Sequence, residues 1–195
     1  TQIWSVWDHF EYTDDVYLPG TGWTHANALE YIPEEDAYYV GLRNLDCIVK
    51  VDRATGETLW VFGGPHTDFD FEGVPPFAEQ HEFQLLDDSI LIFDNGTVSR
   101  NYSQAVEVSV DTDTMSGDVL WNYTTDPTLF VPAGGDVHRL PSDNTLVTWS
   151  TAGQIDEVTP DGDLVWRVNT DLGAGIFYTI WQESLYETEL VGCGG

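Results

Sequence analysis

Positive charge is the scarcest feature of this 195-residue chain, which has six Lys and Arg residues against 34 Asp and Glu and a net charge of -28. Nucleic acids and anionic membrane surfaces attract basic patches, so this balance argues against both as partners. The excess of carboxylates favours a high-salt setting, where screening shortens the repulsion between like charges. An ordinary acidic secreted protein fits the composition equally well.

Long apolar runs and cysteines are scarce as well. No stretch is long and apolar enough to cross a bilayer, so no membrane span is predicted, and no signal peptide is predicted in these residues. The chain starts at Thr1 without Met, from which we expect a mature or excised piece. Two cysteines, Cys47 and Cys193, allow at most one internal disulfide and leave the redox compartment open.

Aromatic residues and short β-type segments are abundant instead. Eight Trp, nine Tyr and nine Phe can build a core despite the charge. Runs of β-branched and aromatic residues alternate with turn sequences such as Asp94-Asn95-Gly96 and Pro160-Asp161-Gly162, where Asn and Gly tolerate the positive φ of tight hairpins. Many short strands with regular turns predict an all-β fold.

Three similar stretches each begin with a histidine and end with a tryptophan. They start at His25, His81 and His138 and end at Trp60, Trp121 and Trp166. A recurring four-stranded unit of roughly 40–50 residues is typical of a β-propeller blade. We therefore predict a single β-propeller portion over residues 1–195, with three four-stranded blades at about 22–64, 78–125 and 135–170.

The strands within each blade follow from the same comparison. The second strands are expected at 37–41, 89–94 and 145–150, and the third strands at 48–52, 105–110 and 155–159. Partial blades are expected at both ends, because Ile3 to Trp7 resembles the outer strand of a preceding blade and residues 171–195 are available for another. A closed propeller needs at least about four blades, so we expect another chain or a missing N-terminal segment to complete the ring.

The histidines at the start of the three repeats indicate a candidate functional site. The first strand of a propeller blade lines the central channel, so His25, His81 and His138 are predicted to converge near one mouth of that channel. Three imidazoles at one repeat position suit a binding site. A strand cap or a polar turn would explain any one of these histidines alone.

Three of the six cations lie near the inferred channel. Arg43 and Arg100 each stand five residues before a predicted third strand, and Arg139 directly follows His138. Arginine donates forked hydrogen bonds, so histidines with arginines suit a tetrahedral oxyanion. Ion pairing with the abundant carboxylates is the alternative for Arg43 and Arg100. The histidines could also hold zinc or another transition metal, but neighbouring arginines would repel a dication, and neither a metal nor another cofactor is predicted.

Three sequons would permit N-glycans on an exported protein. They stand at Asn95, Asn101 and Asn122. Such triplets also arise by chance in a chain rich in Thr, so chance occurrence is the alternative to glycosylation at these positions.

The histidine-containing segments resemble the bacterial, nucleotide-independent arylsulfotransferases. The matching segments are Trp23–Tyr31, Gln80–Leu86, Phe93–Gly96, Ser99–Arg100 and Gly135–Pro141, with the less specific blade-closing text Ile48–Gly64 and a weaker match at Phe177–Tyr186. The resemblance covers most of residues 20–186. It implies a six-bladed propeller, secreted to the periplasm or the extracellular space, that moves a sulfuryl group from an aryl sulfate to a phenol.

The resemblance also implies residue roles. In that family a channel histidine attacks the aryl sulfate and carries the sulfuryl group between two substrates in a ping-pong reaction. By position His138 resembles this nucleophile, and His25, His81 and Arg100 resemble the sulfate binders. A neutral imidazole is a good nucleophile, and the developing phenolate needs a proton or a positive field.

Two features depart from the family pattern. The chain has about half the length expected for a six-bladed fold. Phe83 stands where a polar side chain is expected.

The competing hypothesis is a non-enzymatic secreted propeller, with glycans on its loops, that acts in adhesion or extracellular assembly.

Overall fold

The computed structural model describes residues 2–11, 22–171 and 173–182, and three four-stranded antiparallel sheets follow one another along this part of the chain. The first sheet contains β1 (Ala26–Ile32), β2 (Ala37–Leu42), β3 (Cys47–Asp52) and β4 (Thr58–Phe62). The second contains β6 (Phe83–Leu85), β7 (Ser89–Asp94), β8 (Gln104–Ser109) and β10 (Val119–Tyr123). The third contains β11 (Asp136–Arg139), β12 (Thr145–Trp149), β13 (Gln154–Val158) and β14 (Leu164–Asn169).

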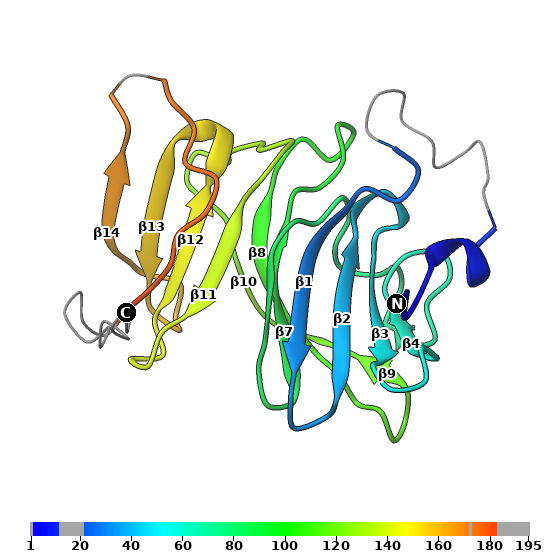
Figure 1. Ribbon diagram of the computed structural model, residues 1–195. Helices are drawn as coiled ribbons and strands as arrows, with labels where there is room; N and C mark the ends of the chain where they lie inside the picture. The colour runs from blue at the N-terminus through cyan, green and yellow to red at the C-terminus, as the bar shows by residue number, and fades with distance from the viewer. Residues whose placement is uncertain (1, 12–21, 172, 183–195) are drawn as a thin grey trace, which may run out of the picture.

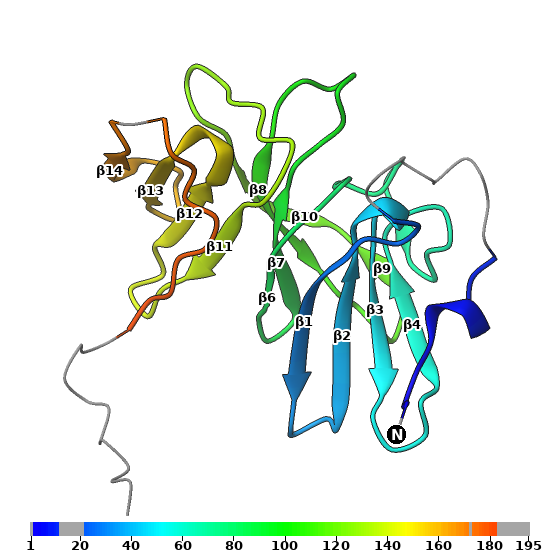
Figure 2. The ribbon, with the colours of Figure 1, turned by 45° about the horizontal axis from the view of Figure 1, so that its top comes forward.

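These sheets are the blades of a β-propeller. Within each blade the strands pair in chain order from the first to the fourth (Figure 1). Figure 2 shows β1, β6 and β11 toward the middle of the molecule, with β4 and β14 at its two outer sides. The predicted class, an all-β propeller with three four-stranded blades, is confirmed.

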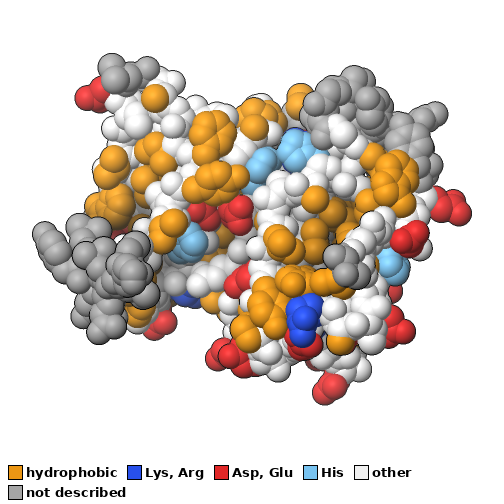
Figure 3. Space-filling model, in the orientation of Figure 1, with side chains coloured by type: hydrophobic (Ala, Val, Ile, Leu, Met, Phe, Trp, Pro, Cys, Tyr) orange, Lys and Arg blue, Asp and Glu red, His pale blue; other side chains and the backbone are white. Residues whose placement is uncertain are grey.

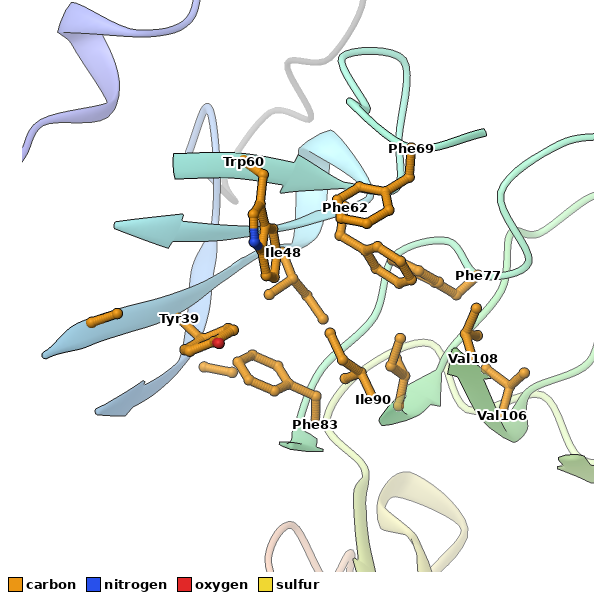
Figure 4. Close-up of a cluster of buried hydrophobic side chains, with 13 residues drawn as sticks. Tyr39, Ile48, Trp60, Phe62, Phe69, Phe77, Phe83, Ile90, Val106 and Val108 are labelled. Atoms are coloured by element: carbon orange, nitrogen blue, oxygen red, sulfur yellow. The ribbon is translucent and has the colours of Figure 1, made fainter. Parts of the chain in front are cut away.

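The apolar faces of successive blades pack against each other. Trp60 and Phe62 of the first blade belong to one buried cluster with Ile90 of the second (Figure 4). A second cluster joins the second and third blades, where the ring centroids of Phe93 and Trp149 are 5.6 Å apart. Because apolar burial is the main driving force of folding, these two faces hold the three blades together.

The closing tryptophans occupy one structural position in all three blades. Trp60, Trp121 and Trp166 lie opposite Lys50, Glu107 and Glu157 of the third strands, and the fourth strand carries one extra residue directly before each tryptophan. Trp60 is 7% exposed and Trp166 is 39% exposed. The next blade covers Trp60, whereas no described sheet follows the third blade.

The N-terminal segment does not form the predicted strand. Residues 3–7 contain part of the 3-10 helix η1 (Val6–Asp8). Trp4 Nε1 donates a hydrogen bond to Thr58 Oγ1 at 3.0 Å, and Trp4 and Val6 pack on the outer face of the first blade. The expectation of a partial blade is wrong here because this segment covers a sheet face instead of pairing with a strand edge.

The described C-terminal residues also lie on a blade without forming a strand. Residues 173–182 contain no strand, and Ile176 N–H donates to Ser150 O at 2.9 Å. The remainder of the expected C-terminal partial blade, together with Cys193, lies outside the described residues.

One short parallel pairing links the first two blades. β5 (Asp70–Phe71), which follows the first blade, pairs with β9 (Ser116–Gly117) in the last hairpin of the second blade. Within the described ranges, no helix has the length and apolar character needed to cross a bilayer.

Candidate functional site

His25 and His81 meet at one end of the inner strands. His25 directly precedes β1 and has a left-handed φ of 48°, and His81 lies two residues before β6. Their ring centroids are 6.1 Å apart in an edge-to-face arrangement. Arg43, which begins the 3-10 helix η3 (Arg43–Leu45) after β2, acts electrostatically on both rings. The structure thus brings together three predicted residues; His25 and His81 are called the imidazole pair below.

The imidazole pair is neutral at pH 7. Burial lowers the pKa of His25, and the positive charge of Arg43 lowers it further. Burial is also the main cause of the lowered pKa of His81, because a low-dielectric surrounding disfavours the charged form. His25 Nδ1 is buried without a hydrogen-bond partner among the described residues, which leaves a polar atom for a ligand.

Asn95 fixes the orientation of His81. Its Nδ2 donates to the carbonyl oxygens of Val131 at 2.7 Å and Gly134 at 2.8 Å. Its Oδ1 lies 2.7 Å from His81 Nδ1 and accepts the proton there, so the lone pair of neutral His81 is on Nε2. Asn95 is fully buried, and the glycosylation prediction at this residue is wrong because its amide nitrogen is used inside the core.

Arg100 adjoins the imidazole pair through Asp94 and Asn95. Its guanidinium lies 2.7 Å from Asp94 Oδ2, and its Nε donates to Tyr102 O at 3.2 Å. Its Nη2 is buried and has no hydrogen-bond partner within the described part of the chain. Asp94 pairs with Arg100, and the next residue, Asn95, bonds to His81. These two consecutive residues therefore connect Arg100, with its unpaired Nη2, to the imidazole pair.

His138 lies at another level of the propeller. It is the third residue of β11 and pairs with Leu146 of β12, whereas the His25 carbonyl accepts the N–H of Arg43 just beyond β2. Ser150 begins the 3-10 helix η4 (Ser150–Ala152) just as Arg43 begins η3. Arg43 and Ser150 are therefore equivalent positions. His25 lies opposite Arg43, whereas His138 lies opposite Leu146, four residues before Ser150. This offset corresponds to about 13 Å of strand length. The expectation of one shared repeat position is therefore wrong for His138.

Two acceptors hold one nitrogen of the His138 ring. Nε2 lies 2.6 Å from Thr179 O and 3.2 Å from Asp136 Oδ2, so the proton of the neutral ring is on Nε2 and the lone pair is on Nδ1. Asp136 Oδ2 also accepts the N–H of Thr179 at 2.8 Å. The hydrogen bond that His138 donates to Asp136 raises the pKa of His138, because a carboxylate stabilises the imidazolium form.

His138 lines a hollow of about 270 Å³ between the inner strands. The other lining residues are Ala28, Leu29 and Glu30 of β1, with Glu82, Phe83 and Gln84 at β6. Burial raises the pKa of Glu82 to about 7, and the charge of Asp136 adds to this effect. Burial also raises the pKa of Glu30. This space, called the carboxyl hollow below, contains two acids with raised pKa values, and the pKa of Glu82 lies in the range that suits acid–base chemistry.

The imidazole pair and the carboxyl hollow adjoin at the start of β6. His81 N–H donates to Phe93 O, and Phe93 N–H donates to Glu82 O, so two residues oppose one in a β-bulge. His81 then belongs to the imidazole pair while the next residue, Glu82, lines the carboxyl hollow. Figure 3 shows histidine side chains at separate places in the middle of one face, with acidic side chains between them.

Arg139 points away from the carboxyl hollow. Side chains alternate along a strand, and Val137, two residues earlier, is buried against the second blade. Arg139 Nη2 lies 2.7 Å from Glu107 Oε2, and its Nε donates to Thr145 Oγ1 at 3.0 Å. Contrary to the substrate-binding expectation, Arg139 forms an ion pair between two blades.

Every Lys and Arg of the chain has a carboxylate partner. The pairs are Arg43–Glu79, Lys50–Glu35, Arg53–Asp36, Arg100–Asp94, Arg139–Glu107 and Arg167–Asp156. Ion pairing, the alternative considered for Arg43 and Arg100, is therefore present at both. The free Nη2 of Arg100 shows that pairing does not use all its donors.

Neither a metal cluster nor a reactive thiol stands out near these histidines. Within the described ranges, no group of three or more His, Cys, Asp or Glu side chains is arranged to hold a metal ion. Cys47 is a buried free thiol, and burial raises its pKa.

The family description "Arylsulfotransferase (ASST)" matches residues 4–171. The chain belongs to the arylsulfotransferase family. The match includes the imidazole pair and the carboxyl hollow. A search of the curated proteins found no match to this arylsulfotransferase-family chain.

Solved structures resemble the fold of this arylsulfotransferase-family chain at low identity. Virginiamycin B lyase from Staphylococcus aureus is 12% identical, with a TM-score of 0.49 over 81% of this chain and 45% of that chain. The PQQ-bound aldose sugar dehydrogenase from Streptomyces coelicolor is 17% identical, with a TM-score of 0.49 over 72% of this chain and 46% of that chain. The match thus spans less than half of each of those proteins.

Proposed function

We propose that this chain forms part of the site of a sulfotransferase that moves a sulfuryl group from an aryl sulfate to a phenol, with His138 as the transient carrier. The observation that carries the proposal is the His138 ring, whose Nε2 is held by Thr179 O and Asp136 while the ring lines an open hollow. The lone pair on Nδ1 is then the nucleophile. Membership of the arylsulfotransferase family supplies the type of group transferred.

The reaction has two balanced halves. Nδ1 attacks the sulfur of the donor, the N–S bond forms, and the S–O bond to the aryl group breaks with its electron pair on the phenolic oxygen. The sulfated ring is cationic, and its Nε2–H donates to the Asp136 carboxylate, which stabilises it. In the second half an acceptor phenol loses its proton, its oxygen attacks the sulfur, and the N–S electron pair returns to His138.

The family resemblance assigns the sulfate oxygens to residues at the level of the imidazole pair, about 13 Å of strand length from His138. His25 Nδ1 and Arg100 Nη2 are buried polar atoms without protein partners among the described residues, so an anion held by them is separate from a sulfuryl group on His138. Arg43 adds positive field, although its guanidinium also pairs with Glu79. His81 donates to an anion through Nε2 only after this atom takes a proton, because Asn95 holds the other nitrogen.

A chromogenic donor tests the proposal. The full-length protein should release 4-nitrophenol from 4-nitrophenyl sulfate only when an acceptor phenol is present, and His138→Ala should lower kcat at least about 10³-fold. His9→Ala is the matched control, since His9 lies in the N-terminal segment, away from the imidazole pair and the carboxyl hollow. Absence of turnover by the wild-type protein would contradict the proposed sulfotransferase activity and favour a non-enzymatic propeller.

We also propose that further blades complete the ring beyond the third blade. Leu164, Trp166 and Val168 of β14 are exposed, although the next blade covers the corresponding tryptophan of the first blade. Native mass spectrometry of the full-length protein distinguishes the two sources of these blades. A monomer supports a longer polypeptide, and an oligomer supports another chain.

Export from the cell is a further proposal. Asn101 and Asn122 are exposed, so N-glycans can be attached there if the protein is exported through a glycosylating pathway. Fractionation of the source cells tests the location, and protein found only in the cytoplasm would contradict it.

A further inference from the structure

We propose that Glu82 is the catalytic residue that carries the phenolic proton, donating it to the departing phenol and removing it from the acceptor phenol. The inference rests on the proposed sulfuryl transfer and adds to it the group that handles the proton. The family resemblance assigned no role to Glu82, and its neighbour His81 was the expected functional residue.

The geometry places Glu82 where the phenolic oxygen must be. Glu82 and His138 line the same hollow of about 270 Å³ from two different inner strands. The lining of this hollow is mainly polar, and Ala28, Leu29 and Phe83 supply its apolar part, which can contact an aromatic ring. A donor with its sulfur at His138 therefore has its bridging oxygen within the space that Glu82 lines.

The other two carboxyl groups around the hollow are already engaged. Glu30 accepts the backbone N–H of Leu85. Asp136 accepts hydrogen bonds from Val137 N–H at 2.9 Å and Thr179 N–H at 2.8 Å, as well as from His138. The Glu82 side chain makes no hydrogen bond within the described part of the chain, so its oxygens are available to a substrate.

The charges around Glu82 keep both of its protonation states accessible. Asp136 and His138 face it from β11, and Glu30 faces it from β1. Burial, followed by the negative charge of Asp136, raises the pKa of Glu82 to about 7. An acid–base group is most effective when its pKa is near the working pH.

The proton then balances over the two halves. As the S–O bond breaks, the phenolic oxygen takes the proton of Glu82, which leaves a neutral phenol, the Glu82 carboxylate and a sulfated His138 whose cationic ring is balanced by its anionic sulfonate group. The carboxylate next removes the proton of the acceptor phenol while that oxygen attacks the sulfur. Glu82 ends protonated and His138 ends neutral, without an oxidant, reductant or other co-reactant.

Leaving-group dependence in the full-length protein tests this role. Glu82→Gln should lower kcat/KM for phenyl sulfate about 10²-fold, because phenolate is a poor leaving group. It should lower kcat/KM for 4-nitrophenyl sulfate much less, because 4-nitrophenolate leaves readily without a proton. The alkaline decrease of kcat/KM for phenyl sulfate should also disappear in the variant.

Two matched variants sharpen the result. Glu34→Gln removes one exposed carboxylate from a turn and should leave both donors unaffected. Glu30→Gln removes the neighbouring acid of the hollow and should not give the leaving-group pattern. Equal losses with both donors in Glu82→Gln, or the graded pattern in Glu30→Gln instead, would overturn the role of Glu82 alone. Absence of turnover in the wild-type protein would overturn the proposed function as well.

Discussion

The chemistry of His81 and of His138 is set by a neighbouring side chain that accepts the ring proton. Asn95 accepts from His81 Nδ1, and Asp136 accepts from His138 Nε2. The two rings therefore present different atoms to a ligand, Nε2 in His81 and Nδ1 in His138. This difference distinguishes the two rings more clearly than their similar sequence contexts do.

Asp136→Asn should lower the pKa of His138, because the carboxylate that stabilises the imidazolium is lost. In the wild type this raised pKa stabilises the fold fully below the unfolded-state value of about 6.5, and the contribution is lost as pH rises through the folded-state pKa. NMR titration of the His138 ring measures the change. The control is Asp143→Asn on the exposed turn of the same hairpin, and an unchanged pKa in Asp136→Asn would contradict the expectation.

Asn95→Ala should destabilise the protein by about 2–4 kcal/mol, because the buried Gly134 carbonyl loses its donor and the Val131 carbonyl keeps only the long hydrogen bond from Ser103 Oγ at 3.4 Å. Asn122→Ala changes another sequon asparagine, which is exposed on β10, and should change stability by less than about 0.5 kcal/mol. Urea unfolding measures both variants. Equal effects would show that burial of Asn95 contributes little.

The sequence predicted the histidines more readily than the residues that control them. Asn95 had the signature of a glycan site, and only its burial shows that it belongs to the core. Glu82 directly follows His81, but strand alternation would send it to the opposite side. The bulge opposite Phe93 breaks that alternation, and no residue in the sequence marks it.

The strands of the blades were predictable because their local patterns are strong. The second strand expected at 89–94 is β7 (Ser89–Asp94), and the third expected at 48–52 is contained in β3 (Cys47–Asp52). Both are apolar runs bounded by turn residues. The segment at 3–7 has a similar apolar content, but its side chains cover the first blade, and composition does not distinguish these uses.

The register of His138 was not predictable from spacing. The three histidines are nearly evenly spaced, and this suggested equivalent positions. The tryptophans, which do share a structural position, are unevenly spaced because the connections between strands differ in length. Spacing alone cannot assign a length difference to one loop or another.

The repeated tryptophan position offers a matched comparison between blades. Trp60→Ala should cost about 3–5 kcal/mol, because the ring is buried between two blades. Trp166→Ala removes the same side chain from the same position of the third blade, where it is partly exposed, and in the 195-residue chain alone it should cost less than about 1 kcal/mol. Thermal unfolding of the two variants and the wild type under the same conditions measures both losses of stability. A large loss in Trp166→Ala would indicate that another blade already covers this face.

The charge of the whole molecule is dominated by unpaired carboxylates. Six cations pair with six carboxylates, whereas the chain has 34 acidic residues. Repulsion among the remainder destabilises the compact state and is screened by salt. We expect the Tm to rise as KCl increases from 0.1 to 2 M, measured by scanning calorimetry, with an uncharged osmolyte series as control. A falling Tm would show that the ion pairs outweigh the repulsion.

Complete pairing of the cations also governs how an anionic donor reaches the protein. Because every basic side chain is paired, no positively charged patch attracts an anion. The negative long-range field of the protein therefore slows diffusional encounter with an aryl sulfate. Added salt should speed capture of the donor and leave capture of a neutral phenol unchanged. Stopped-flow rates at several ionic strengths measure this asymmetry, in which the proposed anionic donor binds more slowly at low than at high ionic strength.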